Sequence, residues 1–204
     1  MPVINVTLLP GYPLEVEQRL ASRLAVAAQS VIAAPAAGTI VFVNHASTYR
    51  RDGRFPAGGA PHRPVAGELA LAFLAAMEAR DLAAARRFLA ADFVMCFPGG
   101  PDMSRLEELV ERSRGRYRSV AKKLERVDES WTEAGAVVYC SGRLHGTWND
   151  GSSFSGIRFI DRFEIEDGLI RRQDVWNDMG LQPERLKQPG PQPDGAQRQG
   201  GRNA

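Results

Sequence analysis

Cysteine and histidine are scarce in this sequence, which limits disulfide and metal chemistry. The 204 residues include two cysteines and three histidines. Cys96 and Cys140 lie far apart in apolar runs, which favours buried free thiols in a reducing compartment over a disulfide. Two cysteines are too few for a zinc site, and His45, His62 and His145 share no ligand spacing. We therefore expect no metal and no other cofactor.

Charge of one sign and long apolar runs are also lacking. The 26 lysine and arginine residues are balanced by 24 acidic residues, so no general attraction for nucleic acid is expected. The most apolar stretch, residues 25–43, is interrupted by Gln29, Pro35 and Gly38, which indicates a helix end, a turn and a strand rather than a membrane span. No basic region precedes the first apolar run, so no secretory signal is indicated. We expect a cytoplasmic protein without a nucleic-acid or membrane partner.

Two changes in composition divide an otherwise ordinary globular sequence. Glycine, proline and polar residues gather from Ala57 to Pro64, which is typical of a linker. From Gln188 onward no aliphatic residue is larger than alanine, which is typical of disorder. We predict a first module over residues 1–59, a linker over 60–65, a second domain over 66–182 and a disordered tail over 183–204.

The first module has the pattern strand, helix, strand. Residues 3–9 are rich in β-branched side chains and are followed by a Pro-Gly turn. Apolar residues at spacings of three and four then run from Val16 to Val31, and a second β-rich run occupies residues 39–44. A right-handed crossover would make the two strands parallel. So small a unit buries little surface alone, so we expect self-association or a partner domain.

The second domain has several short helices followed by strands. The patterns predict helices over residues 66–79, 82–90 and 104–120, and strands over 93–97, 121–132, 135–148, 153–166 and 169–178. Asn-Asp-Gly at 149–151 and Asp-Gly at 167–168 supply hairpin turns. Helices followed by an antiparallel meander indicate an α+β domain with its helices packed on one face of the sheet.

Proline at position 2 carries the first functional hypothesis. Methionine is normally removed before a small residue, which would expose Pro2 as a secondary amine. An α-amino group titrates near pH 8, and an apolar pocket or nearby cations lower its pKa toward neutrality. Such an amine can act as a general base or as an imine-forming nucleophile. Met-Pro starts are common, so Pro2 alone does not establish a site.

The residues around Pro2 resemble the 4-oxalocrotonate tautomerase family. The strand, the Leu-Pro-Gly turn, the helix and the Ala-Pro at 34–35 follow the order and spacing of that family. The segment DGRFPAGG at 52–59 resembles its Gly-x-Phe-x-x-Gly-Gly segment. The resemblance implies a βαβ subunit with Pro2 as the catalytic base and Phe55 in the lining of the active site. Active sites of this family combine residues of neighbouring chains, which implies a homo-oligomer.

The chain departs from the family at two substrate-binding arginines, whose positions hold Tyr12 and Ile40. Recognition of a dicarboxylate in the manner of the family is therefore not implied. Arg54 adjoins Phe55 and could supply a replacement charge. Tyr12 could donate its phenol to a carbonyl oxygen, or it could cap the first turn of the helix.

The run from Ala72 to Gly180 resembles the cone-shaped α+β barrel of ketosteroid isomerases, nuclear transport factors and polyketide cyclase-like proteins. The motifs that carry the resemblance are EARDL at 78–82, FLAADF at 88–93 and FIDRFEIEDGLI at 159–170. This fold hosts enzymes, binders and assembly modules, so it implies no single function. The base and the tyrosine of ketosteroid isomerase fall on Phe97 and Phe73, so that chemistry is not expected. Only its later aspartate persists, as Asp161.

Asp161 is a candidate on its own residues. Its side of a period-two strand also holds Ile157, Phe159, Phe163 and Ile165. A carboxylate on an apolar face should be protonated, paired or directed into a polar cavity. The structural alternative is an ion pair with Arg143 or Arg158.

Other polar residues could line the same cavity. Asp174, Trp176 and Asp178 share one side of the last strand, and Tyr139 and His145 share one side of an earlier strand. Alternation alone does not decide which face these sides occupy. The arginines at 105, 112, 114, 116 and 118 are interpreted as a solvated helix face, paired with nearby glutamates.

These patterns favour an isomerase of the tautomerase type that acts on a small carbonyl or enol compound. Pro2 would move the proton, Phe55 would shape an apolar pocket, and Arg54 or Tyr12 would stabilise the enolate oxygen. The alternative places catalysis or ligand binding in the second domain, as a cyclase-like or hydrolase-like enzyme. A third hypothesis is non-catalytic binding or dimerisation by that domain, with an inactive first module.

Overall fold

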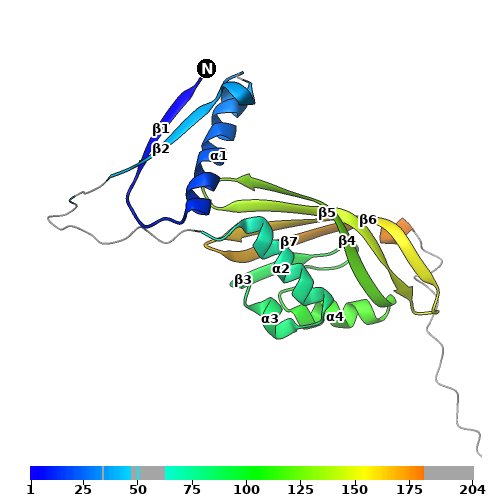
Figure 1. The fold of residues 1–204 in the computed structure, drawn as a ribbon. Coiled ribbons are helices and arrows are strands. Elements are labelled where there is room, and N and C mark those ends of the chain that lie inside the picture. Colours follow the sequence, from blue (N-terminus) through cyan, green and yellow to red (C-terminus); the bar gives the residue numbers. More distant parts are fainter. Residues whose placement is uncertain (34, 47–49, 51–62, 182–204) are drawn as a thin grey trace, which may run out of the picture. The chain divides into compact units, whose positions relative to one another are not determined.

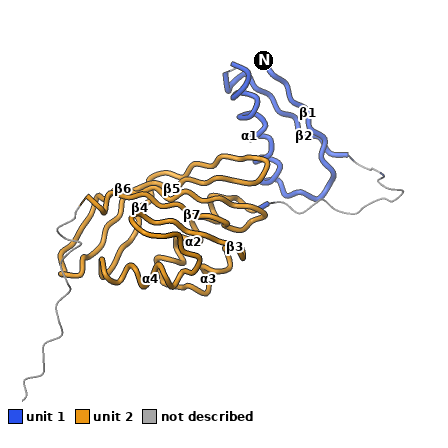
Figure 2. Tube along the Cα trace, turned by 180° about the vertical axis from the view of Figure 1, so that it is seen from behind, with its two compact units in different colours: residues 1–63 blue, residues 64–204 orange. Residues whose placement is uncertain are grey.

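The computed structural model describes residues 1–33, 35–46, 50 and 63–181. The chain forms two compact units, residues 1–63 and 64–204 (Figure 2). Arg54 and Phe55, to which the sequence assigns roles in a tautomerase site, lie outside the described residues, as does the tail. None of the described helices is both long and apolar enough to cross a membrane.

The N-terminal unit is a βαβ arrangement (Figure 1). Strands β1, Val3–Leu8, and β2, Ile40–His45, are parallel. They are connected by helix α1, Leu14–Val31, and by a short 3-10 helix, Ala36–Gly38. Pro13 precedes α1 as its N-cap residue, a position near the start of the helix where a missing N–H removes no helical hydrogen bond. The strand–helix–strand order and the parallel pairing predicted from the sequence are confirmed.

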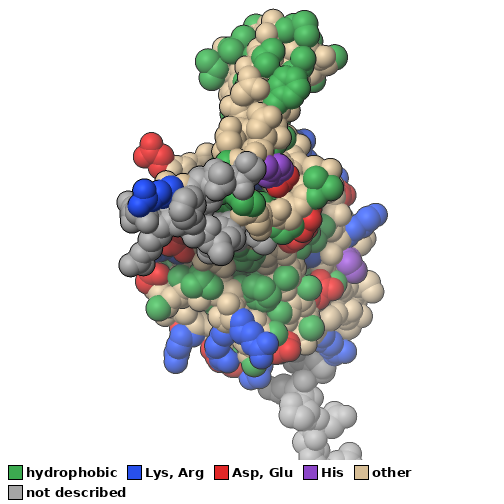
Figure 3. All heavy atoms as spheres, turned by 60° about the vertical axis from the view of Figure 1, so that its left-hand side comes forward, with side chains coloured by type: hydrophobic (Ala, Val, Ile, Leu, Met, Phe, Trp, Pro, Cys, Tyr) green, Lys and Arg blue, Asp and Glu red, His purple; other side chains and the backbone are tan. Residues whose placement is uncertain are grey.

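The N-terminal unit has little interior of its own. Helix α1 contains no fully buried residue, and the side chains of β1 alternate between exposed and half-buried. The exposed apolar side chains include Val3, Leu14, Val26, Val31 and Phe42, which give the unit an apolar surface (Figure 3). A unit of this size gains little stability from such a core.

The C-terminal unit has three helices on one face of a five-stranded sheet (Figure 1). The helices are α2, Ala66–Glu78, α3, Leu82–Arg86, and α4, Leu106–Arg114. The strands are β3, Leu89–Cys96, β4, Tyr117–Trp131, β5, Ala136–Trp148, β6, Ser153–Glu166, and β7, Leu169–Asn177; a 3-10 helix, Asp178–Leu181, follows. The sheet order is β3-β7-β6-β5-β4, with only the β3–β7 pair parallel. The predicted α+β domain with an antiparallel meander is confirmed.

Helix α4 is shorter than the helix predicted over residues 104–120. It ends at Arg114, Gly115 occupies its C-cap, and Tyr117 already begins β4. Tyr117 lies opposite Trp148 of β5. This cross-strand pairing overrides a local pattern of charged residues that by itself favours a helix.

Irregular pairing curves the sheet around its helices. Glu125 is an extra residue of β4 opposite Gly142 and Ser141 of β5, and further register shifts occur between β5 and β6 and between β6 and β7. Extra residues bend a strand and increase its twist, so the sheet becomes concave toward the helices. A Cβ atom on Gly142 would overlap the carbonyl oxygen of Lys123, so glycine is required opposite this bulge.

Two apolar clusters fill the concave side of the sheet. The larger cluster includes Phe73, Phe93, Met95, Val138, Cys140 and Phe163. The smaller cluster consists of Leu144, Trp148, Phe154, Ile157, Phe159 and Met179. On β6 the two clusters meet between Phe159 and Phe163, and the inward-facing residue between those two is Asp161.

Replacement of Gly142 by alanine should destabilise the C-terminal unit. The new methyl group would overlap the backbone of β4, so we expect the free energy of unfolding to fall by about 2 kcal/mol. Gly115→Ala is the matched control, because its Cβ position is open and its φ is −75°. Urea unfolding followed by circular dichroism measures both variants. Equal stability of the two variants would contradict the role assigned to the bulge.

Candidate active site

Two adjoining cavities, about 80 and 100 Å³ in volume, lie on the concave side of the C-terminal sheet. They share Phe97, Leu109, Tyr117, Val120 and Lys122 as lining residues. The first also touches Arg112, Leu144, Phe159, Val175 and Met179, and the second touches Phe73, Leu74, Met77, Glu78 and Gln173. The shared residues make the two cavities one largely apolar space with a few polar groups.

An ion pair between Lys122 and Asp161 lies at the wall of this space. Lys122 Nζ donates a hydrogen bond to Asp161 Oδ2 and lies 4.8 Å from the centre of the Phe159 ring. The Lys122 side chain is 23% exposed, whereas that of Asp161 is completely buried. The ammonium group therefore faces the cavity, and the carboxylate lies behind it in the protein interior.

The register of the strands brings this pair together. Lys122 of β4 lies opposite Leu144 of β5, and Asp161 of β6 lies opposite Cys140 of β5. These positions all belong to the concave face, since side chains alternate along a strand. Gly142 lies between Cys140 and Leu144 in that row and has no side chain. The Lys122 side chain spans β5 to reach Asp161 of β6.

Asp161 lies in surroundings that disfavour a charge. Its Oδ1 atom is buried and has no hydrogen-bond partner among the described residues. Burial of a carboxylate in apolar surroundings costs several kcal/mol unless the charge is paired. The Lys122 ammonium is therefore the main compensation for the buried charge. A buried ionisable group next to a cavity is a candidate for a functional role.

Cys140 lies beside this pair but is not suited to be a nucleophile. Burial, and secondarily the negative charge of Asp161, raise the pKa of the Cys140 thiol to about 12. The reactive thiolate is therefore not formed at neutral pH. Both cysteines are free; Cys140 is buried, as the sequence predicts, whereas Cys96 is partly exposed.

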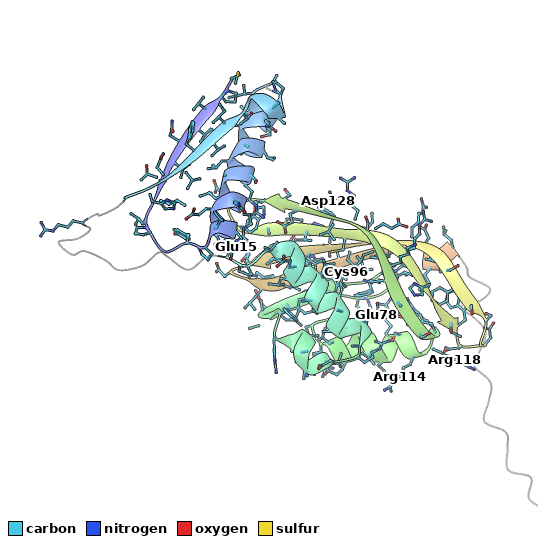
Figure 4. All side chains as sticks on the ribbon, viewed as in Figure 1. Glu15, Glu78, Cys96, Arg114, Arg118 and Asp128 are labelled. Carbon is cyan, nitrogen blue, oxygen red and sulfur yellow. The ribbon has the colours of Figure 1, made fainter. Side chains whose placement is uncertain are left out.

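Glu78 supplies a carboxylate to the second cavity. It lies at the C-terminal end of α2 (Figure 4), and its Oε2 atom accepts a hydrogen bond of 3.0 Å from the backbone N–H of Lys122. Gln173 of β7, which is 3% exposed, lines the same cavity. Across residues 1–33, 35–46, 50 and 63–181, no three His, Cys, Asp or Glu side chains gather in a group that could hold a metal ion. The cavity thus combines a carboxylate, a cation and an amide, which suits acid–base chemistry.

The apolar face predicted around Asp161 is confirmed, but the predicted partners are wrong. Ile157, Phe159, Phe163 and Ile165 are all buried with it. Arg143 pairs with Glu125, and Arg158 pairs with Asp178, so neither arginine compensates the Asp161 carboxylate.

The actual partner, Lys122, is not among the site residues predicted from the sequence. Val120 and Lys122 are two residues apart on β4, so they share a face, and both line the cavity. This spacing is a usable signal in the sequence. The prediction of a helix over 104–120 hides it, because it places Val120 in the helix and starts the strand only at residue 121.

Tyr139, His145, Asp174 and Trp176 lie on the opposite, convex face of the sheet, so their assignment to the cavity is wrong. The alternating concave positions of these strands are held by Val138, Cys140, Leu144, Gln173 and Val175. Asp174 pairs with Arg162 and Arg172, and Trp176 is 53% exposed. Alternation grouped the residues of each strand correctly but could not tell which side the helices cover.

The N-terminal unit holds Pro2 and Tyr12 far apart. Pro2 precedes β1, and its carbonyl oxygen accepts a hydrogen bond of 3.1 Å from the N–H of Ile40. Tyr12 follows the other end of β1 and lines a separate cavity with Leu8, Val16, Leu20 and Arg23. At about 3.3 Å per residue, β1 separates Pro2 from Leu8 by roughly 20 Å. Pro2 and Tyr12 of one chain therefore do not share a site.

The sequence model of the SnoaL-like domain family matches residues 70–173, just over half of the chain. An NTF2-like protein of unknown function from Burkholderia pseudomallei is similar in structure, with a TM-score of 0.52 and 16% identity over 59% of this chain and 96% of its own. TerC, co-crystallized with polyporic acid, gives a TM-score of 0.51 and 15% identity over 59% and 97%. An NTF2-like protein from Burkholderia thailandensis gives 0.48 and 22% over 59% and 96%. No curated protein matches the chain significantly.

A double-mutant cycle should show that Lys122 and Asp161 stabilise the fold as a pair. Lys122→Met leaves a buried carboxylate unpaired, so we expect the free energy of unfolding to fall by about 3 kcal/mol. Asp161→Leu should cost less, because the partly exposed ammonium can turn into the cavity. The double variant should regain most of the loss, since it buries no charge. Urea unfolding provides the four stabilities, and additive losses would contradict the pairing.

The Cys140 thiol should resist modification in the folded protein. Its folded pKa, about 12, exceeds the ordinary value of 9.0, so this thiol stabilises the fold fully below about pH 9 and progressively less as the pH rises toward 12. At about pH 8, dithiobis-nitrobenzoate should therefore label Cys140 only after unfolding in urea. Mass spectrometry of the labelled peptides distinguishes Cys140 from Cys96. Rapid labelling of Cys140 without urea would contradict the assignment.

Proposed function

The chain belongs to the SnoaL-like domain family, and we propose that its C-terminal unit is an enzyme that transfers protons on a small, largely apolar carbonyl compound. Isomerases, cyclases and hydrolases of carbonyl compounds depend on this chemistry. The observation that carries the proposal is the Lys122–Asp161 pair at the wall of an apolar cavity. The pair holds a cation where a negatively charged oxygen can form.

Lys122 is the proposed electrophilic group. When a proton leaves the carbon next to a carbonyl, the electron pair moves to the carbonyl oxygen, which becomes an enolate. A fixed ammonium in apolar surroundings stabilises that oxygen far more than water does, because the site needs no reorganisation. Asp161 is a positioning residue, since it holds Lys122 Nζ in place from behind and does not line the cavity.

Glu78 is the proposed proton acceptor. Its carboxylate accepts a hydrogen bond from the backbone N–H of Lys122, and both residues line the second cavity, so a ligand there can contact both side chains. The C–H bond would break toward Glu78, and the protonated Glu78 would return the proton to the enolate oxygen, which gives the enol, or to the γ-carbon where a β,γ double bond extends the enolate. The net reaction is an isomerisation that consumes no other reactant.

A small organic ligand for this fold has support in TerC, which has been co-crystallized with polyporic acid. The Lys122 cavity of the present chain, about 80 to 100 Å³ in each part, is lined mainly by aromatic and aliphatic side chains. Such a space suits a ring or a short hydrocarbon chain and offers few hydrogen bonds to a sugar or a nucleotide.

A second candidate function rests on the N-terminal unit. We propose it as a tautomerase in which Pro2, exposed by removal of Met1, serves as the base. The parallel βαβ arrangement supports it, because Pro2 stands at the start of a strand and is held by the backbone of Ile40. The separation of Pro2 from Tyr12 excludes Tyr12 of the same chain from this site.

Deuterium exchange tests the principal proposal. Full-length protein in D₂O should accelerate exchange of the α-protons of aryl ketones such as phenylacetone, followed by proton NMR. Lys122→Met and Glu78→Gln should each reduce the catalysed rate about 100-fold, because each removes a group that acts on the reacting atoms. Arg114→Gln is the matched control, since Arg114 is exposed on α4 and pairs with Glu111 (Figure 4).

The same assay separates the two candidates. If Pro2→Ala abolishes exchange while Lys122→Met leaves it intact, the activity belongs to the N-terminal unit. Exchange that survives in all three variants would contradict both. Intact mass of the purified protein shows whether Met1 is removed, and a retained methionine would eliminate the proline mechanism.

A further inference from the structure

Arg112 departs from the interpretation of α4 as a solvated face. It lies in the last turn of α4 and lines the first cavity. Its Nη2 atom donates a hydrogen bond of 2.8 Å to the carbonyl oxygen of Pro98. Its Nη1 atom is buried and has no hydrogen-bond partner among the residues that the structure describes. A buried guanidinium donor without an acceptor is unfavourable, so the protein satisfies the hydrogen bonds of this cavity-lining guanidinium only in part.

The guanidinium group of Arg112 is held in place before any ligand binds. The Pro98 carbonyl fixes one nitrogen, and the backbone of Gly100 packs so closely that a Cβ atom there would overlap the guanidinium. A donor fixed in this way loses little conformational entropy on binding. Arg112 is therefore a preorganised binding group rather than a mobile surface arginine.

The charges around the first cavity are unbalanced. Arg112, Arg116 and Lys122 line it, and within the described part of the chain no carboxylate does. Asp161 compensates Lys122 from behind, but no described acidic residue pairs with Arg112 or Arg116. The glutamates of α4 are engaged elsewhere, in the pairs Arg105–Glu108, Arg114–Glu111 and Arg86–Glu107. An anion in this cavity would therefore meet two uncompensated guanidinium groups.

We infer that the molecule bound here is a carboxylate, and that Arg112 selects it. A guanidinium group presents its N–H donors in a plane that matches the two oxygens of a carboxylate. The other walls at this point are apolar, including Leu109, Leu144 and Phe159. Such walls suit a flat carboxylate on a hydrocarbon group better than a strongly hydrated phosphate.

The two inferences together define a substrate class. The carboxylate of the substrate would lie at Arg112, and its carbonyl oxygen would lie at Lys122, which lines both cavities. Its apolar group would extend into the second cavity, toward Phe73 and Met77. The substrate would then be an apolar oxo acid. The carbonyl part of this assignment rests on the proposed function, whereas carboxylate binding by Arg112 does not depend on it.

Paired ligands that differ only in the carboxylate test the inference. The probes are phenylpyruvate and phenylacetate, each compared with an uncharged counterpart, phenylacetone and phenylacetamide. Calorimetry with the full-length chain should show at least tenfold tighter binding of the acids. Arg112→Gln should weaken the acids tenfold to 100-fold and leave the uncharged ligands unchanged. Arg112→Lys should retain part of the preference, because it keeps the charge and loses the planar fork.

The controls separate carboxylate binding from catalysis. Arg114→Gln changes an exposed arginine two residues further along α4, so it should leave all affinities unchanged. Lys122→Met should reduce deuterium exchange about 100-fold while the preference for acids persists. The absence of exchange in every protein, the wild type included, would therefore overturn only the proposed function. Three results would each overturn the role of Arg112. The first is equal binding of acids and uncharged ligands, and the second is no binding of either acid at about 10 mM. The third is an equal loss of affinity for the acids in Arg114→Gln. Thermal unfolding shows whether each variant is folded. If Arg112→Gln does not fold, the affinities of Arg112→Lys for the acids decide whether Arg112 binds the carboxylate.

Discussion

Burial of the Asp161 carboxylate between two apolar clusters is the constraint on which the functional half of this structure depends. A charge in that position is tolerated only next to a cation. The cation is Lys122, two strands away, and its side chain spans β5 to reach Asp161. Gly142 of β5 faces the bulge that curves the sheet. The bulge shapes the cavity, and the cross-strand ion pair gives it a charged group.

The cavity acquires its chemistry from elements that are distant in the sequence. Lys122 comes from β4, Glu78 from the end of α2, and Arg112 from the end of α4. The two cations are both fixed by protein acceptors, a buried carboxylate and a backbone carbonyl. Positive charges held in this way in an apolar space are suited to an anionic ligand and to negative charge that develops during a reaction.

The two units differ in how they are stabilised. The C-terminal unit has a well-packed core and contains the SnoaL-like domain, so its fold and its family are established by independent findings. The N-terminal unit has a helix without a buried residue and an apolar surface, and only the function proposed for it rests on a resemblance to tautomerases. Pro2 and Tyr12 lie toward opposite ends of β1, so they do not form a site within one chain.

The sequence by itself determined the class of each unit, the meander, and the apolar face that contains Asp161, because these follow from local periodicity and turn residues. Only the tertiary structure decided the partner of Asp161 and the direction of Arg112. It also placed Tyr139 and Trp176 on the convex face. Alternation shows which side chains share a face, but the face that becomes the interior depends on where the helices pack, and a contact such as Lys122–Asp161 depends on bulges and register across three strands.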